Sequence, residues 1–209
     1  MPSQPETVKL PFKGLVLSSE DRLVTVLELP GLLNQGPGTF LVLTDKSVNT
    51  VPMPRFKFMF QAMQLDTIQS YPLDCLTGVD NTSSKHGFRW LMFERGNEEL
   101  GSILIPNQSV GQVLPSLNAV LTIFHGNELV GLSKDRFSLR PVDLGEDRKQ
   151  KLLTQIATMR DECIRKYTDP RFVNRLHRMR IVTFVFNTLM LLGVTVLGVI
   201  FLMEKCSQK

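Results

Sequence analysis

The stretch from Ile181 to Met203 constrains this chain more than any other part of it. It reads IVTFVFNTLMLLGVTVLGVIFLM and carries no charged residue in 23 positions, with six residues after it. An α-helix rises about 1.5 Å per residue, so this stretch would be roughly 34 Å long, enough to cross a bilayer core of about 30 Å. A core helix of a globular domain is the alternative, but such helices rarely run so far without a charge. We therefore expect a single membrane helix over 181–203 and a short lumenal or intermembrane tail over 204–209.

The distribution of charge follows the membrane stretch. The chain of 209 residues carries +4 overall, and the part from Arg165 to Lys209 alone carries +6. The first 164 residues therefore carry −2, the difference between these two values. Because the basic residues gather before the apolar stretch and not in a phosphate-binding groove, we expect no nucleic-acid partner.

The flanks of the apolar stretch predict the topology. In membrane proteins, Lys and Arg are enriched on the cytosolic side of a membrane helix. Here they are enriched before residue 181, so the domain before this residue is expected to be cytosolic. The first ten residues, MPSQPETVKL, contain no apolar leader, and the three cysteines form no CxxC pair or even framework. Both features fit a cytosolic domain in a reducing compartment. With so short a tail, the layout resembles that of tail-anchored proteins.

Residues 10–125 show the pattern of a compact antiparallel β-domain. After a flexible arm over 1–9, apolar and β-branched runs alternate with turn-forming clusters. The expected strands are GLVL (14–17), LVTVLEL (23–29), two within 39–53 around Thr44-Asp45-Lys46, YPLDCLTGVD (71–80), FRWLMFE (88–94) and ELGSILIP (99–106). The pattern then changes to the helical period over 109–125, with Pro115 expected in the first turn.

Two further segments connect this domain to the membrane stretch. Residues 126–144 are mixed in character and are expected to be a connector. Residues 145–180 are expected to form a helical juxtamembrane stalk, with a break at 168–170 where Asp169 would cap a new helix and Pro170 would occupy its first position. The fold class is therefore α+β: an antiparallel sandwich or barrel capped by a helix, then a helical stalk and one C-terminal transmembrane helix.

The order of these elements resembles the pleckstrin-homology (PH) superfold, closest to GRAM and bacterial PH-like domains. GTFLVLTDKSV (38–48) is similar to a glycine-strand-turn signature of that superfold, and YPLDCLTGVD (71–80) to one of its strands. The hairpin over 88–106 and the helix over 109–125 follow in the corresponding order. The resemblance covers residues 10–125 and implies a module that binds lipids, proteins or peptides. The phenylalanine-rich segment 56–60 and the lack of a dense basic cluster depart from that pattern.

Three groups of residues are candidate binding sites. The basic approach to the membrane stretch consists of Arg171, Arg175, Arg178 and Arg180, which would dock on anionic lipid headgroups or only set the orientation of the helix. Arg55, Phe56, Lys57 and Phe58 alternate basic and apolar side chains and would form a lipid-binding or partner-binding edge, or a solvated strand face. Asn187 lies inside the membrane stretch and would contact a partner helix or reach the headgroups.

The sequence lacks the common signatures of enzymes. It contains no P-loop, no GxGxxG, no GxSxG, no HExxH and no Cys/His spacing for a metal. The histidines are isolated, and Cys75 lies in an apolar run where a buried inert thiol is expected. We therefore expect a protein that is not an enzyme and that uses no cofactor or metal.

The sequence leaves three hypotheses about function. The first is a membrane adaptor or organising protein whose cytosolic domain binds a protein or lipid partner. The second is an accessory subunit of a membrane-embedded complex, and the third is a trafficking factor of the SNARE type. The endoplasmic reticulum is the first choice of membrane, because the tail is only weakly basic, and the outer mitochondrial membrane is the second. The acceptor sequences Asn81-Thr82-Ser83 and Asn107-Gln108-Ser109 should stay unglycosylated in a cytosolic domain.

Overall fold

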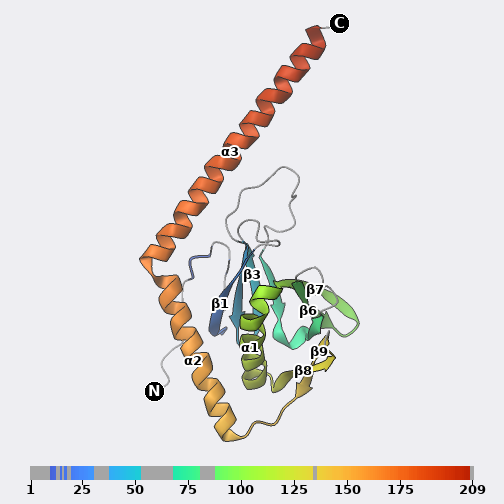
Figure 1. Ribbon diagram of the computed structural model, residues 1–209, viewed down its shortest axis with the longest axis vertical. Coiled ribbons are helices and arrows are strands. Elements are labelled where there is room, and N and C mark those ends of the chain that lie inside the picture. Colours follow the sequence, from blue (N-terminus) through green and yellow to red (C-terminus); the bar gives the residue numbers. More distant parts are fainter. Residues whose placement is uncertain are drawn as a thin grey trace.

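The computed structural model describes residues 10–12, 15, 17, 20–30, 38–52, 68–80, 88–133 and 136–207. Within these residues the protein is a mixed α+β structure of two antiparallel sheets and three α-helices, the last of which projects far from the rest (Figure 1). The two sheets remain open and do not close into a barrel. The α+β class and the long apolar C-terminal helix agree with the sequence analysis.

The first sheet has the order β1-β2-β3-β4. Its strands are β1 (Leu23–Leu29), β2 (Thr39–Thr44), β3 (Ser47–Pro52) and β4 (Gln69–Pro72). The predicted turn between β2 and β3 is present. The Thr44 hydroxyl accepts the backbone N–H groups of Lys46 and Ser47 at 3.2 and 2.8 Å and so fixes the register of the hairpin.

The second sheet has the order β7-β6-β5-β9-β8. Its strands are β5 (Leu76–Asp80), β6 (Phe88–Arg95), β7 (Glu98–Pro106), β8 (Asn127–Ser133) and β9 (Arg136–Pro141). The run 71–80 was expected to be one strand, but it contributes to both sheets. A short 3-10 helix, Leu73–Cys75, separates β4 from β5. Pro72 cannot donate to a ladder, which suits the point where the chain passes from one sheet to the other.

The segment 126–144 is more than a connector, because it holds β8 and β9. β9 pairs with β5 along its free edge, with Gly78 opposite Ser138. A Cβ atom on Gly78 would lie 2.6 Å from the carbonyl oxygen of Phe137, so glycine permits the close approach of β9. The β-domain therefore continues to Pro141, beyond the predicted boundary at 125.

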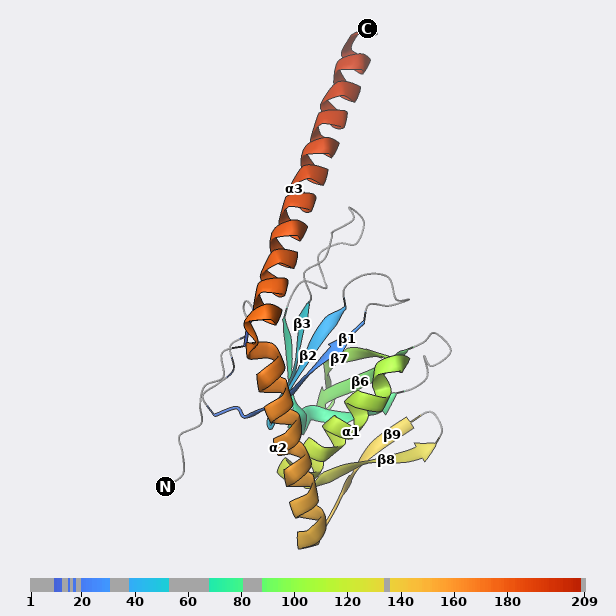
Figure 2. The same cartoon turned by 60° about the vertical axis from the view of Figure 1, so that its left-hand side comes forward.

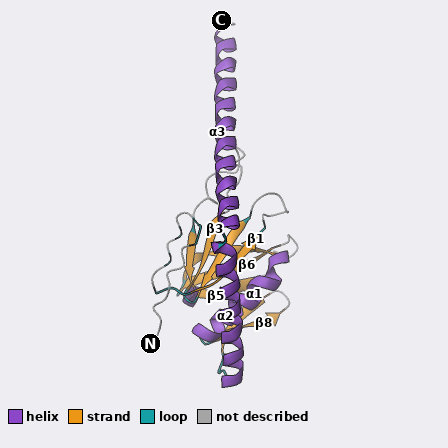
Figure 3. Cartoon of the chain, turned by 90° about the vertical axis from the view of Figure 1, so that its left-hand side faces the viewer, coloured by secondary structure: helices purple, strands orange, loops and turns teal. Residues whose placement is uncertain are grey.

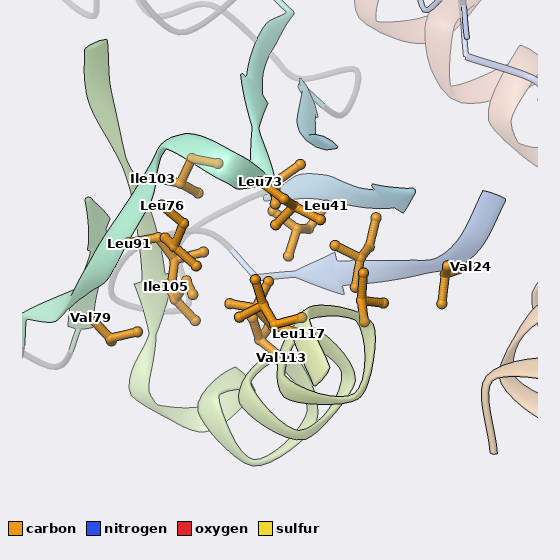
Figure 4. Close-up of a cluster of buried hydrophobic side chains, with 14 of the residues drawn as sticks. Val24, Leu41, Leu73, Leu76, Val79, Leu91, Ile103, Ile105, Val113 and Leu117 are labelled. Carbon is orange, nitrogen blue, oxygen red and sulfur yellow. The ribbon is translucent and has the colours of Figure 1, made fainter. Parts of the chain in front are cut away.

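Helix α1 (Asn107–Phe124) covers the space between the two sheets. It begins two residues earlier than predicted, so Pro115 lies in its interior and not in its first turn. Its buried face supplies Val113, Leu117 and Leu121. Val113 and Leu117 point toward the strands of the sheets (Figure 4). These side chains, with Leu41 and Leu43 from the first sheet and Leu91 and Ile105 from the second, form the main core.

Two further helices complete the described structure: α2 (Glu146–Thr168) and α3 (Pro170–Ser207). α2 ends and α3 begins where the sequence predicts a break. The sequence analysis expected residues 145–180 to be a helical juxtamembrane stalk and did not say which surface its apolar stripe contacts. In the structure α2 packs on β1 and α1, and the first turns of α3 also contact the domain (Figures 2 and 3).

Candidate functional site at the elbow between α2 and α3

The chain changes direction at Asp169, between α2 and α3, and we call this junction the elbow. The backbone of Asp169 is extended, with φ −59° and ψ 123°. Its carboxylate accepts the backbone N–H of Arg171 at 2.7 Å, and its carbonyl accepts that of Val173 at 3.0 Å. Pro170 has no N–H that needs a partner. Asp169 therefore caps α3, as the sequence predicts for this position.

An apolar cluster surrounds the elbow. The ring centroids of Tyr167 and Phe172, on either side of Asp169, lie 4.8 Å apart at 85°. Phe40 of β2 lies edge-on to Tyr167 at 6.1 Å, and Phe12 lies 4.7 Å from Phe40. Leu176, on the next turn of α3, is only 4% exposed. We call Phe12, Phe40, Tyr167, Phe172 and Leu176 the elbow cluster.

The elbow cluster lies on the face of the first sheet that is turned away from the main core. Register places Val26 opposite Val42, and Glu28 opposite Phe40, on this outer face. Val26, Phe40 and Val42 are buried there by α2, by the start of α3 and by the N-terminal segment. The first sheet is therefore covered on both faces, which explains why β2 reads as a nearly continuous apolar run.

Polar groups border the cluster at β1. Lys166 forms an ion pair with Glu28, with 2.7 Å between Nζ and Oε1. The Tyr167 hydroxyl donates to the same carboxylate oxygen at 3.2 Å. Burial, together with the neighbouring charge of Glu28 and this hydrogen bond, raises the pKa of Tyr167 above its ordinary value. The hydroxyl therefore stays protonated and remains a donor to Glu28.

The N-terminal segment crosses the same site. The Arg180 guanidinium donates to the carbonyl oxygen of Pro11 at 2.9 Å, and Phe12 is 4% exposed. Leu10, Leu15 and Leu17 pack against the same cluster. Neither Leu15 nor Leu17 belongs to a strand, although GLVL (14–17) was expected to form one. These described residues tie the β-domain to the start of α3, and we call them the strap: Leu10, Pro11, Phe12, Leu15 and Leu17.

The structure separates the four predicted basic residues of the membrane approach into two groups. Arg171, Arg175 and Arg178 are exposed, and their spacing of four and three residues places them on one side of α3. Arg180 is half-buried and is used by the strap. Arg180 therefore differs from the other three, which the sequence could not show.

Two other predicted sites cannot be placed. Arg55, Phe56, Lys57 and Phe58 lie outside the described residues. Asn187 lies on α3, but its side chain is outside the described part of the structure. Both remain predictions from the sequence.

The described residues contain no group of three or more His, Cys, Asp and Glu side chains that could hold a metal ion. Cys75 and Cys163 are both buried free thiols. Burial raises the pKa of Cys163 to about 11, because the thiolate would lose its hydration. Cys163 packs with Tyr167 on the outer face of the first sheet, as part of that apolar cluster.

The remainder of α3 is a candidate membrane helix. Its segment Pro170–Leu197 has 28 residues, and the most apolar 18-residue window within it has a mean hydropathy of 1.9. None of that window is buried in the protein. Leu189, Leu191 and Leu197 are each more than 60% exposed. Large aliphatic side chains exposed on all sides of one helix suit a lipid environment. By length and composition, α3 can cross a membrane.

The residues that sequence reasoning missed are Phe12 and Phe40. The signal that could have found Phe40 is the run TFLVLT (39–44), which lacks the alternation of a strand with one wet face. No local signal marks Phe12, which lies between a polar arm and a short apolar run. Comparisons with protein-family models, with curated proteins and with solved structures found no match to this chain.

Proposed function

We propose that this protein is a single-pass membrane adaptor whose α+β domain binds a protein or lipid partner at the cytosolic surface. α3 would be the anchor, and the endoplasmic reticulum would be its membrane, with the outer mitochondrial membrane as second choice. The proposed orientation follows the excess of Lys and Arg on the domain side of the apolar stretch.

The elbow cluster is the observation that carries the proposal. It joins the β-domain, α2, the N-terminal segment and the candidate membrane helix in one apolar core. Truncating a single large side chain in such a core typically costs about 2–5 kcal/mol. A domain held in this way keeps a constant height and orientation above the bilayer, which suits a protein that presents a binding surface at the membrane.

The proposed PH-like character of the domain is supported by the order of its elements. A four-stranded antiparallel sheet is followed by a second sheet and then by α1. The added hairpin β8–β9 extends the second sheet beyond the region of the resemblance. The choice between a lipid and a protein partner belongs to experiment, because a fold of this kind serves both.

The accessory-subunit hypothesis is supported by the same fixed geometry, since a subunit must also hold its domain in one place. Purification in mild detergent separates the two hypotheses. A complex of fixed stoichiometry favours the accessory subunit, whereas an adaptor should purify largely without its partner.

The SNARE-type hypothesis finds no support in the packing. A trafficking helix of that type needs a free apolar stripe for pairing with other helices. In α2 the stripe Ile156, Cys163 and Tyr167 is buried within the protein's own domain.

Deletion of residues 181–209 tests the anchor. The truncated protein should move to the soluble fraction after carbonate extraction, while the full chain stays with the membrane. Proximity labelling from the N-terminus should then lose its membrane-surface partners in the truncated protein. Carbonate-resistant membrane association after the deletion, or an unchanged set of labelled partners, would contradict the proposal.

Two native acceptor sequences test the orientation. Asn107 is exposed at the start of α1, and Asn81 lies in the other acceptor sequence. Neither should carry a glycan in the proposed topology. A mobility shift that endoglycosidase removes, and that Asn107→Gln or Asn81→Gln abolishes, would show that the domain lies on the other side of the membrane from the cytosol. Imaging a fluorescent fusion of residues 165–209 would identify the membrane.

A further inference from the structure

The exposed side of α3 next to the elbow carries three guanidinium groups with no protein partner in the described residues. Arg171, Arg175 and Arg178 are exposed and belong to none of the ion pairs found there. The neighbouring cations are used differently, because Lys166 pairs with Glu28 and Arg180 donates to Pro11. We call Arg171, Arg175 and Arg178 the arginine stripe.

The described residues offer the arginine stripe little negative charge. No acidic residue occurs between Pro170 and Met203, and the first turn of α3 contains none. The Asp169 carboxylate accepts a backbone N–H, and the Glu28 carboxylate binds Lys166 and Tyr167. Arg171 lies at the positive end of the helix dipole, where the only acidic residue of the turn, Asp169, is already used as the cap of α3. Within the described residues the charge of the stripe is largely uncompensated, which leaves it available to an anion from outside the chain.

Its position relative to the apolar stretch identifies the source of that anion. At ~1.5 Å per residue, Arg178, Arg175 and Arg171 lie about 4.5, 9 and 15 Å before Ile181 along the helix. The headgroup layer of a bilayer is roughly 5–8 Å thick on each side of its hydrocarbon core. Arg178 and Arg175 would lie within or just above this layer, and Arg171 within a Debye length of it.

The packing of the elbow orients the stripe. Phe172 and Leu176 hold one side of α3 against the β-domain. The stripe lies roughly a third of a turn around the helix from that side, so the domain leaves it open to the bilayer surface. We infer that the arginine stripe is a binding site for the phosphate groups of anionic phospholipids, which surround α3 in the cytosolic leaflet. This inference rests on the proposed membrane anchoring of α3.

Lipid selectivity of the full chain tests the site directly. The protein is reconstituted in phosphatidylcholine vesicles that contain trace spin-labelled phosphatidylserine or spin-labelled phosphatidylcholine. Electron spin resonance then measures the fraction of each probe that is immobilised next to the protein. A basic residue near the surface attracts an anionic lipid by about fivefold, and averaging over the whole lipid shell should leave a preference of roughly two- to fivefold.

Two triple variants with equal loss of charge make the test specific. Arg171→Gln/Arg175→Gln/Arg178→Gln should bring the preference for phosphatidylserine close to one. The control, Arg140→Gln/Lys149→Gln/Lys151→Gln, removes exposed charges from β9 and from the start of α2. Both elements lie far from the tip of α3 (Figure 1). It should keep the preference of the wild type.

The outcomes separate this inference from the proposed function. Immobilised lipid without any preference in the wild type, or with a preference that survives in the stripe variant, overturns the arginine stripe as a lipid site and leaves the anchor intact. An equal loss in the control variant also overturns it, because net charge alone would then explain the preference. If neither probe is immobilised, α3 is not in the bilayer, and both the inference and the proposed function fail.

Discussion

At the scale of single residues, a stacking contact between two aromatic rings joins the two sheets at their corner. Tyr71 of β4 stacks on Phe93 of β6 with 4.7 Å between ring centroids and 14° between planes. Gly101, opposite Phe93 on β7, adopts a φ of +137° beside a bulge in the strand pair. A Cβ atom there would lie 2.6 Å from the Tyr71 hydroxyl oxygen. Both the backbone conformation and the space therefore require glycine.

Replacing this glycine should destabilise the protein. Gly101→Ala adds backbone strain and a clash with Tyr71, and we expect a loss of about 2–5 kcal/mol in the free energy of unfolding. Urea denaturation in detergent micelles, followed by the fluorescence of Trp90, measures this change. Gly111→Ala is the matched control, because a Cβ atom meets nothing within 4 Å in α1. It should raise stability by about 0.5–1 kcal/mol, and equal stabilities of the two variants would contradict the account.

Cys163 makes stability depend on pH in the alkaline range. Its pKa is about 11 in the folded protein, against an ordinary value of 9.0 in the unfolded chain. Because the folded state holds the proton more tightly, the stabilising contribution is complete below about pH 9. It is lost as the pH rises toward 11, by at most roughly 2–3 kcal/mol.

Comparison with Cys163→Ala isolates this effect from other titrating groups. The variant has no thiol at this position, so the stability difference between wild type and variant should shrink between pH 9 and 11. Denaturation at a series of pH values gives this difference directly. A difference that stays constant over that range would show that the buried thiol does not contribute.

At the scale of elements, α2 uses its last turn to bind the first sheet. Tyr167 is 1% exposed and contributes a ring to the elbow cluster and a hydroxyl to the edge of β1. The ring and the hydroxyl can be tested separately, because phenylalanine keeps the first and removes the second.

The ring should matter more than the hydroxyl. Tyr167→Phe loses a hydrogen bond to a carboxylate that Lys166 still neutralises, and we expect a cost of about 0.5–1.5 kcal/mol. Tyr167→Ala also leaves a cavity among Phe12, Phe40 and Phe172 and should cost about 3–5 kcal/mol. Thermal denaturation of both variants in micelles shows which substitution costs more stability. Equal costs for the two would mean that the hydroxyl, and not the apolar cluster, holds α2.

At the scale of the whole molecule, the first sheet lies between two apolar cores. Val24, Leu41 and Leu43 face the main core, part of which is shown in Figure 4. Val26 and Val42 face the elbow cluster. Because the start of α3, the candidate membrane helix, takes part in this second core, α3 cannot swing freely relative to the domain. The position of the domain relative to the start of α3 is thus a property of the folded protein.

Loosening the elbow should widen the range of angles between α2 and α3. Spin labels on Ala157→Cys and Val182→Cys, in a chain with Cys206→Ser, report this angle as a distance distribution by pulsed electron resonance. Leu176→Ala should broaden that distribution, because Leu176 is 4% exposed. Val173→Ala, at a position that is 37% exposed, should leave it narrow. A broad distribution in the wild type would show that the elbow is a flexible hinge.

Several elements follow from the sequence alone, because their causes are local. The uncharged run 181–203 is apolar at every helical face, so α3 needs no partner to be recognised. The Thr44-Asp45-Lys46 turn and the Asp169-Pro170 boundary depend on side chains that bond their own backbone neighbours. Local sequence patterns also define β1, the β6–β7 hairpin and α1, which are predicted within a few residues of their observed bounds.

The tertiary structure alone decided where these elements meet. Residues 145–180 have the pattern of an amphipathic helix, but that pattern does not reveal which surface covers the apolar stripe. Four arginines look alike in sequence, yet only contact with Pro11 separates Arg180 from the other three. β8 and β9 join the sheet through an edge of β5 that is more than 50 residues away. Burial of apolar surface is non-directional, so it favours every apolar pairing. Only the packing of the whole chain selects the elbow that joins the domain to α3.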